Sequence, residues 1–127
     1  GRYDLWTKEE KELIWEFKSK HSRAFWYMEK KGEGAPIHNQ MQLWSYLKVK
    51  NIQEGRLVYI SKDDLAILEY PVYLNDKNLE KRVLEELQIL NEAWSLKIPP
   101  QPILDEKDWR FKYCSFHKQC KKLSVNI

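Results

Sequence analysis

Alternation of apolar and polar residues near the start of the chain predicts two β-strands. Residues 1–6 (GRYDLW) and 12–19 (ELIWEFKS) flank a charged turn. Along the second stretch the side chains point alternately to two faces, with Leu13, Trp15 and Phe17 on one and Ile14, Glu16 and Lys18 on the other. Because a buried sheet face tolerates an unpaired charge poorly, Glu16 and Lys18 must reach solvent or serve a polar site.

The rest of the chain continues this order of elements. A long loop is expected over 20–36, where Gly32, Gly34 and Pro36 occur together with aromatic residues. The other patterns predict, in order, a helix at 37–50, strands at 55–61 and 64–72, a helix at 78–96 and an irregular tail from 101. Pro71 indicates that the strand at 64–72 ends there or lies at a sheet edge. Pro99 ends the second helix. The predicted fold is an α/β domain with a mixed sheet flanked by helices.

Length and charge narrow the class of protein. A chain of 127 residues suits a single domain with one core, here with residues 99–127 as a basic tail. No apolar run is long enough to span a membrane and no signal peptide opens the sequence, so a soluble, cytoplasmic protein is expected. The net charge of +3 alone indicates no ligand, but the cations are clustered. They lie after the opening strands (Lys20, His21, Arg23, Lys30, Lys31) and in the tail (Lys107, Arg110, Lys112, Lys118, Lys121, Lys122).

The opening hairpin also contains candidate catalytic chemistry. Asp4 precedes Glu16 by a spacing that lets an antiparallel hairpin bring the two side chains together on one face. With Lys18, two carboxylates and an amine would then converge. Carboxylates suit Mg²⁺ or Mn²⁺, and a neighbouring ammonium can assist attack on a phosphodiester. The alternative is an exposed strand edge that carries ordinary charges.

Five stretches together resemble the PD-(D/E)xK nuclease superfamily, and within it the RecB-like exonucleases of phages and CRISPR systems. They are GRYDLW, WEFKS, HNQMQLWSYL, GRLVYISKDD and WRFKYCSFHKQC, which span nearly the whole chain. The resemblance implies a restriction-endonuclease-like core. It also implies that Asp4, Glu16 and the Phe17 carbonyl ligate the metal and that Lys18 is the catalytic lysine. Tyr3 stands where many members of the family have proline.

The family's Q-x-x-x-Y motif has two candidate glutamines in this chain. Gln42 is followed four residues later by Tyr46, as the motif requires, whereas Gln40 is followed by Trp44. Helical geometry alone does not choose between them, because Gln40 falls on the apolar face of the helix and Gln42 on a face that Tyr46 suggests is partly covered. The motif favours Gln42, and Gln40 is the second choice.

The tail departs from the iron–sulfur members of the family, which carry C-x2-C-x5-C there and a fourth cysteine upstream. Phe111 occupies the first of these positions, and Cys114 and Cys120 are the only cysteines, so no iron–sulfur cluster is expected within one chain. Zinc bound by Cys114, Cys120, His117 and either His21 or His38 is an alternative, although its spacing matches no standard motif. Packing on the core is expected instead, through Trp109, Phe111, Tyr113 and Phe116.

The resulting prediction is an Mg²⁺- or Mn²⁺-dependent deoxyribonuclease, with exonuclease action expected, in the cytoplasm of a prokaryote or a phage-infected host. DNA is the expected partner. The residues expected to contact it are Ser19, Lys20, Arg23, Trp26, Tyr46 and Lys121, although Trp26 suits core packing equally well. The family's helix before the first strand is missing, so either a homo-oligomer or an absent N-terminal segment would complete the fold. The alternative function is a non-catalytic nucleic-acid-binding or assembly domain that retains the nuclease fold.

Overall fold

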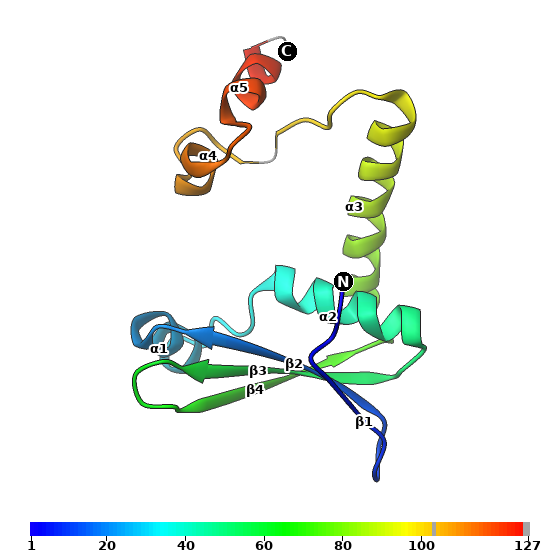
Figure 1. The fold of residues 1–127 in the computed structure, drawn as a ribbon, viewed down its shortest axis with the longest axis vertical. Helices are drawn as coiled ribbons and strands as arrows, with labels where there is room; N and C mark the ends of the chain where they lie inside the picture. The colour runs from blue at the N-terminus through cyan, green and yellow to red at the C-terminus, as the bar shows by residue number, and fades with distance from the viewer. Residues whose placement is uncertain (103, 126–127) are drawn as a thin grey trace. The chain divides into compact units, whose positions relative to one another are not determined.

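Four strands form a mixed sheet in the order β1-β2-β3-β4 in a computed structural model that describes residues 1–102 and 104–125 (Figure 1). The strands are β1 (Leu5–Thr7), β2 (Leu13–Lys20), β3 (Glu54–Ser61) and β4 (Ile67–Tyr73). The strands β2 and β3 run parallel, while β1 and β4 pair antiparallel with them at the two edges. The predicted α/β class with a mixed sheet and helices is therefore confirmed. Pro71 lies within β4 rather than at its end, and as an edge strand β4 tolerates the missing N–H.

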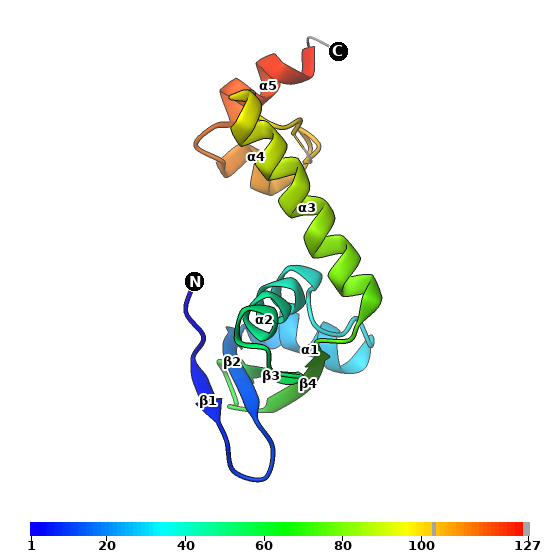
Figure 2. The same cartoon turned by 90° about the vertical axis from the view of Figure 1, so that its right-hand side faces the viewer.

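The helices α1 (Ser22–Lys30) and α2 (Ile37–Lys50) follow β2 and build one core with the sheet. The buried side chains of this core come from alternate strand positions and from both helices: Ile14, Phe25, Met28, Leu43, Trp44, Leu47, Leu57, Tyr59 and Val72. Since Ile14, Glu16 and Lys18 share a face of β2, the two charged residues lie on the face that the helices cover (Figure 2). The helix α2 ends at Asn51, whose left-handed φ of 55° suits an asparagine.

The opposite face of the sheet carries the apolar residues of β2, Leu13, Trp15 and Phe17. Leu5, Phe17, Ile67 and Tyr73 are each at least 42% exposed there. The pattern of β2 thus predicts the two faces correctly, but the more apolar face is the more exposed one. The helices instead cover the face that holds a carboxylate and an amine.

The predicted loop over 20–36 is wrong in its first half, which forms α1. Phe25 and Met28, three residues apart, are buried on one side of this helix, so apolar packing overrides the charged sequence around them. Asp63, in the β3–β4 turn, accepts a hydrogen bond from the Ser22 N–H at the start of α1 (3.0 Å). Hydrogen bonding from the Ser22 side chain, and secondly from its backbone N–H, lowers the pKa of Asp63. The helix ends before Gly32 and Gly34, both of which have positive φ.

Strand ends also differ from the predictions. The first strand begins at Leu5 rather than at residue 1, and the fourth begins at Ile67 rather than at residue 64. The predicted helix over 37–50 is confirmed, and the later one forms α3 (Lys77–Leu96).

The chain divides within α3 into two compact units, Gly1–Glu85 and Glu86–Ile127. Leu79 and Val83, in the first part of α3, belong to the core of the N-terminal unit. The C-terminal unit contains the rest of α3, then α4 (Trp109–Tyr113) and α5 (His117–Val125), so the prediction of an irregular tail is wrong for these segments. Among the described residues no helix is long and apolar enough to span a membrane.

The aromatic residues of the C-terminal unit are mostly exposed. Phe111 is buried, at 8% exposure, whereas Trp109, Tyr113 and Phe116 are 66% exposed or more. The expected packing of all four side chains is therefore wrong for three of them. Trp109 and Tyr113 lie one helical turn apart and contact each other edge to face instead.

Candidate functional site

A chain of hydrogen bonds joins the polar residues of β2 to α2. The Lys18 Nζ donates to Glu16 Oε1 (2.9 Å) and to Gln42 Oε1 (3.0 Å). The Gln42 Nε2 in turn donates to the Tyr46 hydroxyl (3.1 Å). Glu16 is only 3% exposed, whereas the Lys18 side chain is 27% exposed, so the amine lies between a buried carboxylate and solvent.

Asp4 reaches the same strand from the N-terminal segment. Asp4 directly precedes β1, whose first pair with β2 is Leu5↔Trp15. The Phe17 N–H donates to Asp4 Oδ2 (2.8 Å). In a strand the N–H and C=O of one residue point to the same side, so the Phe17 carbonyl also points toward the side where Asp4 lies.

These residues fit a divalent cation. Glu16 Oε2 is buried and has no hydrogen-bond partner among the described residues, which is costly for a carboxylate oxygen. A cation would satisfy it. The oxygen ligands available are those of Asp4, Glu16 and the Phe17 carbonyl, and oxygen donors are what Mg²⁺ and Mn²⁺ prefer. No group of three or more His, Cys, Asp or Glu side chains suited to a metal occurs within residues 1–102 and 104–125, so the site would depend on two carboxylates and a carbonyl.

The geometry distinguishes the two candidate glutamines. Gln42 contacts both Lys18 and Tyr46. Gln40 donates from Nε2 to the Ala35 carbonyl (2.7 Å), which satisfies it through the local backbone. The structure thus brings Gln42, the motif match, to the amine of Lys18, and it gives Gln40 a structural contact.

A second polar pair lies under α2 beside this cluster. Tyr59 pairs with Lys18 in the parallel register, is fully buried, and accepts a hydrogen bond from Asn39 Nδ2 (2.7 Å). Burial raises the pKa of Tyr59 above 10.0, with a smaller opposing effect from the Asn39 bond. The Lys20 Nζ lies 6.0 Å from the centre of the Tyr59 ring.

The residues expected to contact nucleic acid are distributed over several surfaces. Lys20 continues the face of Lys18, while Ser19 lies on the opposite face of β2 and is exposed. On α1, Arg23 is exposed and Trp26 is 46% exposed against Tyr27. Tyr46 is engaged within the site itself. Lys121 lies in the C-terminal unit, where its side chain is 63% exposed and pairs with Glu106.

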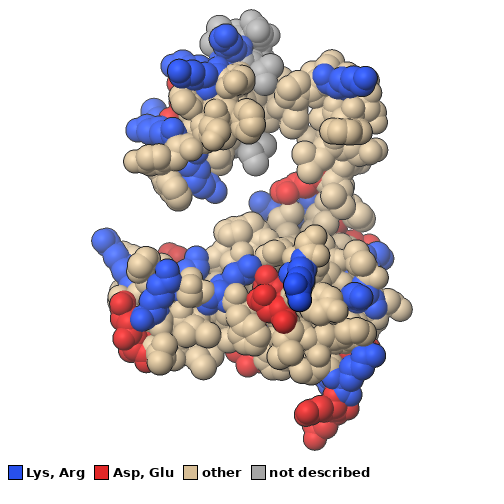
Figure 3. Space-filling view, in the orientation of Figure 1, with Lys and Arg blue, Asp and Glu red and all other residues tan. Residues whose placement is uncertain are grey.

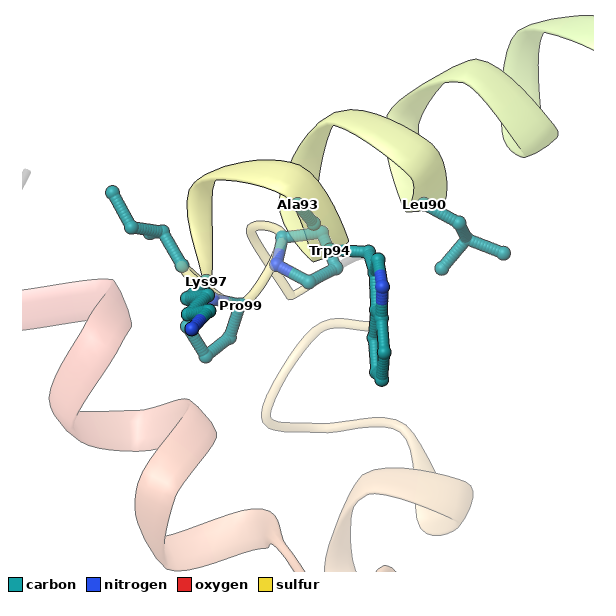
Figure 4. Close-up of a pocket in the computed structure, with 7 residues that line it drawn as sticks. Leu90, Ala93, Trp94, Lys97 and Pro99 are labelled. Atoms are coloured by element: carbon teal, nitrogen blue, oxygen red, sulfur yellow. The ribbon is translucent and has the colours of Figure 1, made fainter.

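Two pockets are lined by residues of the C-terminal unit. One, of about 550 Å³, lies at the end of α3, with Leu90, Ala93, Trp94, Lys97 and Pro99 in its lining (Figure 4). The other, of about 580 Å³, includes Cys114 and Cys120. Both are mainly apolar, and the described residues form no group of ligands that would support the zinc alternative there.

No family model and no curated protein matches the chain. Among solved structures, the chain is similar to the crystal structure of SSO0001, with 30% sequence identity and a TM-score of 0.54. The match covers 94% of this chain and 49% of that chain. This chain therefore spans about half the length of SSO0001.

Sequence reasoning missed two structural contributions to the site and one ion-pair cluster elsewhere in the sheet. Nothing in the pattern indicates that Asp4 is fixed by the Phe17 N–H, or that Asn39 and Tyr59 pair under α2. The ion-pair cluster is that of Glu54, which is 3% exposed at the start of β3 and pairs with Lys11 and Arg56, tying the β1–β2 turn to the sheet. The sequence signal for Glu54 is its position as a charged residue at the start of an apolar strand.

Proposed function

We propose that the N-terminal unit is a metal-dependent deoxyribonuclease domain of the RecB-like type. The observation that carries the proposal is the hydrogen-bonded series Glu16–Lys18–Gln42–Tyr46, with Asp4 fixed at the next residue of the same strand. Residues from three separate segments that match the nuclease motifs meet at one place. The unpaired buried oxygen of Glu16 supports a cation there.

Each residue has a chemical role in this proposal. Asp4, Glu16 and the Phe17 carbonyl would hold Mg²⁺ or Mn²⁺, which when bound supplies Lewis-acid stabilisation of the phosphate and activation of water. Lys18 has three N–H donors, and its contacts with Glu16 and Gln42 engage two of them. The remaining donor can stabilise the negative charge that develops on a phosphate oxygen in the transition state. The hydrogen bond with Gln42 would orient the Lys18 amine toward that phosphate oxygen.

DNA binding would use the dispersed cations. Figure 3 shows Lys and Arg side chains gathered over the segment of α4 and α5. Lys20 and Arg23 follow the site along the chain, and Trp26 is exposed enough to stack on a base. Phosphate contacts of this kind give affinity without sequence specificity. The proposal places the protein in the cytoplasm of a prokaryotic cell or a phage-infected host.

The test is cleavage of linear and circular DNA in Mg²⁺, in Mn²⁺ and with a chelator. We expect metal-dependent cleavage by the parent protein, none with chelator, and none by Lys18→Ala. Lys81→Ala, at an exposed lysine of α3, is the matched control and should cut like the parent. Cleavage of linear but not circular DNA would identify exonuclease action.

The second candidate is a nucleic-acid-binding module without catalysis. Its support is the exposed Trp109, Tyr113 and Phe116 beside the cations of the C-terminal unit. A parent protein that binds DNA but leaves every substrate uncut in Mn²⁺ would favour this function over the nuclease.

A further inference from the structure

Tyr46 contacts both parts of the candidate site. Its hydroxyl accepts the hydrogen bond from Gln42 Nε2 (3.1 Å). Its ring meets the ring of Tyr3 edge to face, with centroids 6.5 Å apart. A Cβ added to Gly1 would lie 2.7 Å from the Tyr46 hydroxyl oxygen, so the backbone at Gly1 passes directly against the phenol.

The hydroxyl determines which end of the Gln42 amide faces Lys18. An ammonium only donates hydrogen bonds, so Lys18 requires the Oε1 end of the amide. The Nε2 end is then turned away and requires an acceptor, which the Tyr46 oxygen provides. Without that acceptor the amide can rotate and present its N–H₂ to the ammonium, where two donors would face each other. The bond to Tyr46 therefore favours the orientation that positions Lys18.

The ring holds the segment that carries Asp4. Figure 1 shows the N-terminal segment running beside α2 before it enters β1. Gly1 and Tyr3 contact Tyr46, and the Lys50 Nζ, one helical turn further on, lies 5.7 Å from the Tyr3 ring. Asp4 follows directly, and its carboxylate reaches the Phe17 N–H. Packing on α2 thus fixes the approach of Asp4 to the strand.

We infer that Tyr46 is a positioning residue with two separable effects, in place of the DNA contact expected of it from the sequence. Its hydroxyl orients Gln42 and thereby Lys18, and its ring holds residues 1–4 and thereby Asp4. The consequence for cleavage rests on the proposed nuclease function. The two positioning effects are properties of the folded chain and are measurable without any substrate.

The test compares Tyr46→Phe, which removes only the hydroxyl, with Tyr46→Leu, which also removes the ring. In ¹⁵N-labelled protein, Tyr46→Phe should shift the Gln42 side-chain amide resonance and leave the Phe17 backbone amide and Mn²⁺ affinity unchanged. Cleavage should slow by up to about 100-fold in kcat, the size of loss that a slightly misplaced catalytic group causes, with KM unchanged. Tyr46→Leu should shift both resonances and also weaken Mn²⁺ binding, measured by calorimetry.

Controls separate positioning from folding. Tyr73→Phe, on the exposed face of β4, should change none of these signals. If Tyr46→Leu does not fold, Gly1→Ala replaces it, because the added Cβ must displace the phenol or the segment and so shift the Phe17 amide.

Two results would overturn the inference. An unmoved Gln42 resonance together with full activity in Tyr46→Phe would exclude the hydroxyl effect. An unmoved Phe17 amide with full Mn²⁺ affinity in folded Tyr46→Leu or Gly1→Ala would exclude the ring effect. A parent protein that does not cut DNA would end the nuclease proposal alone, since the resonances would still decide the positioning.

Discussion

Glu16 is both a buried carboxylate, which costs stability, and a candidate metal ligand. A carboxylate that is 3% exposed is stabilised only if both its oxygens find partners. Lys18 satisfies Oε1, and Oε2 is left without a partner among the described residues. A side chain selected for stability alone would be apolar at this position in the core. The free-energy cost of the unsatisfied oxygen therefore favours a site in which a bound ligand contacts that oxygen.

Glu16→Gln tests this interpretation with little change of shape. The amide can still accept from Lys18, but it offers the metal neither a charge nor a second carboxylate oxygen. We expect Mn²⁺ binding measured by calorimetry to be lost. The thermal midpoint without metal should change little, because losing the ion pair with the part-exposed Lys18 is offset by removing a buried carboxylate oxygen that has no partner among the described residues. Unchanged Mn²⁺ binding would place the metal elsewhere.

Lys18→Ala should separate chemistry from binding. Under the proposed function the variant should lose cleavage, because it lacks the donor proposed for the reacting phosphate, and it should keep most of its DNA affinity. The proposed affinity comes from several dispersed phosphate contacts, of which Lys18 is at most one. Fluorescence anisotropy with labelled DNA in Ca²⁺ measures binding without cleavage. A large loss of affinity in this variant would instead make Lys18 a binding residue.

At the scale of elements, local pattern predicts some parts of the fold and not others. The bounds of α2 follow from Pro36 and the apolar spacing of Leu43, Trp44 and Leu47, which are local signals. The sequence does not predict α1, because the charged residues around Phe25 and Met28 are typical of a loop. The helix is stabilised by the packing of Phe25 and Met28 in the core, which is a tertiary contact. The faces of β2 were read correctly, but which face the helices cover depends on where α1 and α2 pack, and the sequence of β2 does not contain that information.

The candidate site was more predictable than the fold around it. Asp4, Glu16, Lys18 and Gln42 lie at motif spacing; Lys18 contacts Glu16 and Gln42, and Asp4 accepts from the Phe17 N–H. The contacts of Asn39 and Tyr46 arise only when the helix is placed over the sheet. These depend on long-range packing, for which the sequence has no local signal.

The Tyr59–Asn39 pair links α2 to the sheet and predicts a pH dependence of stability. Burial raises the pKa of Tyr59 in the folded protein above its value of 10.0 when exposed. The folded state then holds the phenol proton more tightly than the unfolded state does. Its contribution to stability is complete below the unfolded pKa and is lost as the pH rises through the folded one.

Urea unfolding between about pH 8 and about pH 11 measures this effect. The free energy of unfolding of the parent should fall at the alkaline end, and Tyr59→Phe should reduce that fall. The remaining slope includes Tyr70, whose pKa burial also raises. Tyr73→Phe, at an exposed tyrosine of β4, should keep the slope of the parent. Equal slopes in Tyr59→Phe and the parent would contradict the assignment.

At the scale of the whole molecule, the candidate chemistry and much of the positive charge lie in different compact units. Asp4, Glu16, Lys18 and Gln42 all belong to Gly1–Glu85, while Lys107, Arg110, Lys112, Lys118, Lys121 and Lys122 belong to Glu86–Ile127. Substitutions in the C-terminal unit should therefore alter affinity without altering the chemical step.

Lys121 and Glu106 provide a matched pair to test this separation. The two side chains are 63% and 50% exposed and lie 3.4 Å apart, so they form a surface ion pair of little consequence for stability. Lys121→Ala should weaken DNA binding modestly and reduce the slope of log affinity against log salt by about 1, as expected for one lost phosphate contact. Glu106→Ala should strengthen binding, because it frees Lys121 and removes a negative charge that repels phosphate. Both variants should cut saturating DNA at the rate of the parent. A changed rate at saturation, or the same salt slope in both variants and the parent, would show that the C-terminal cations do not act as a separate binding surface.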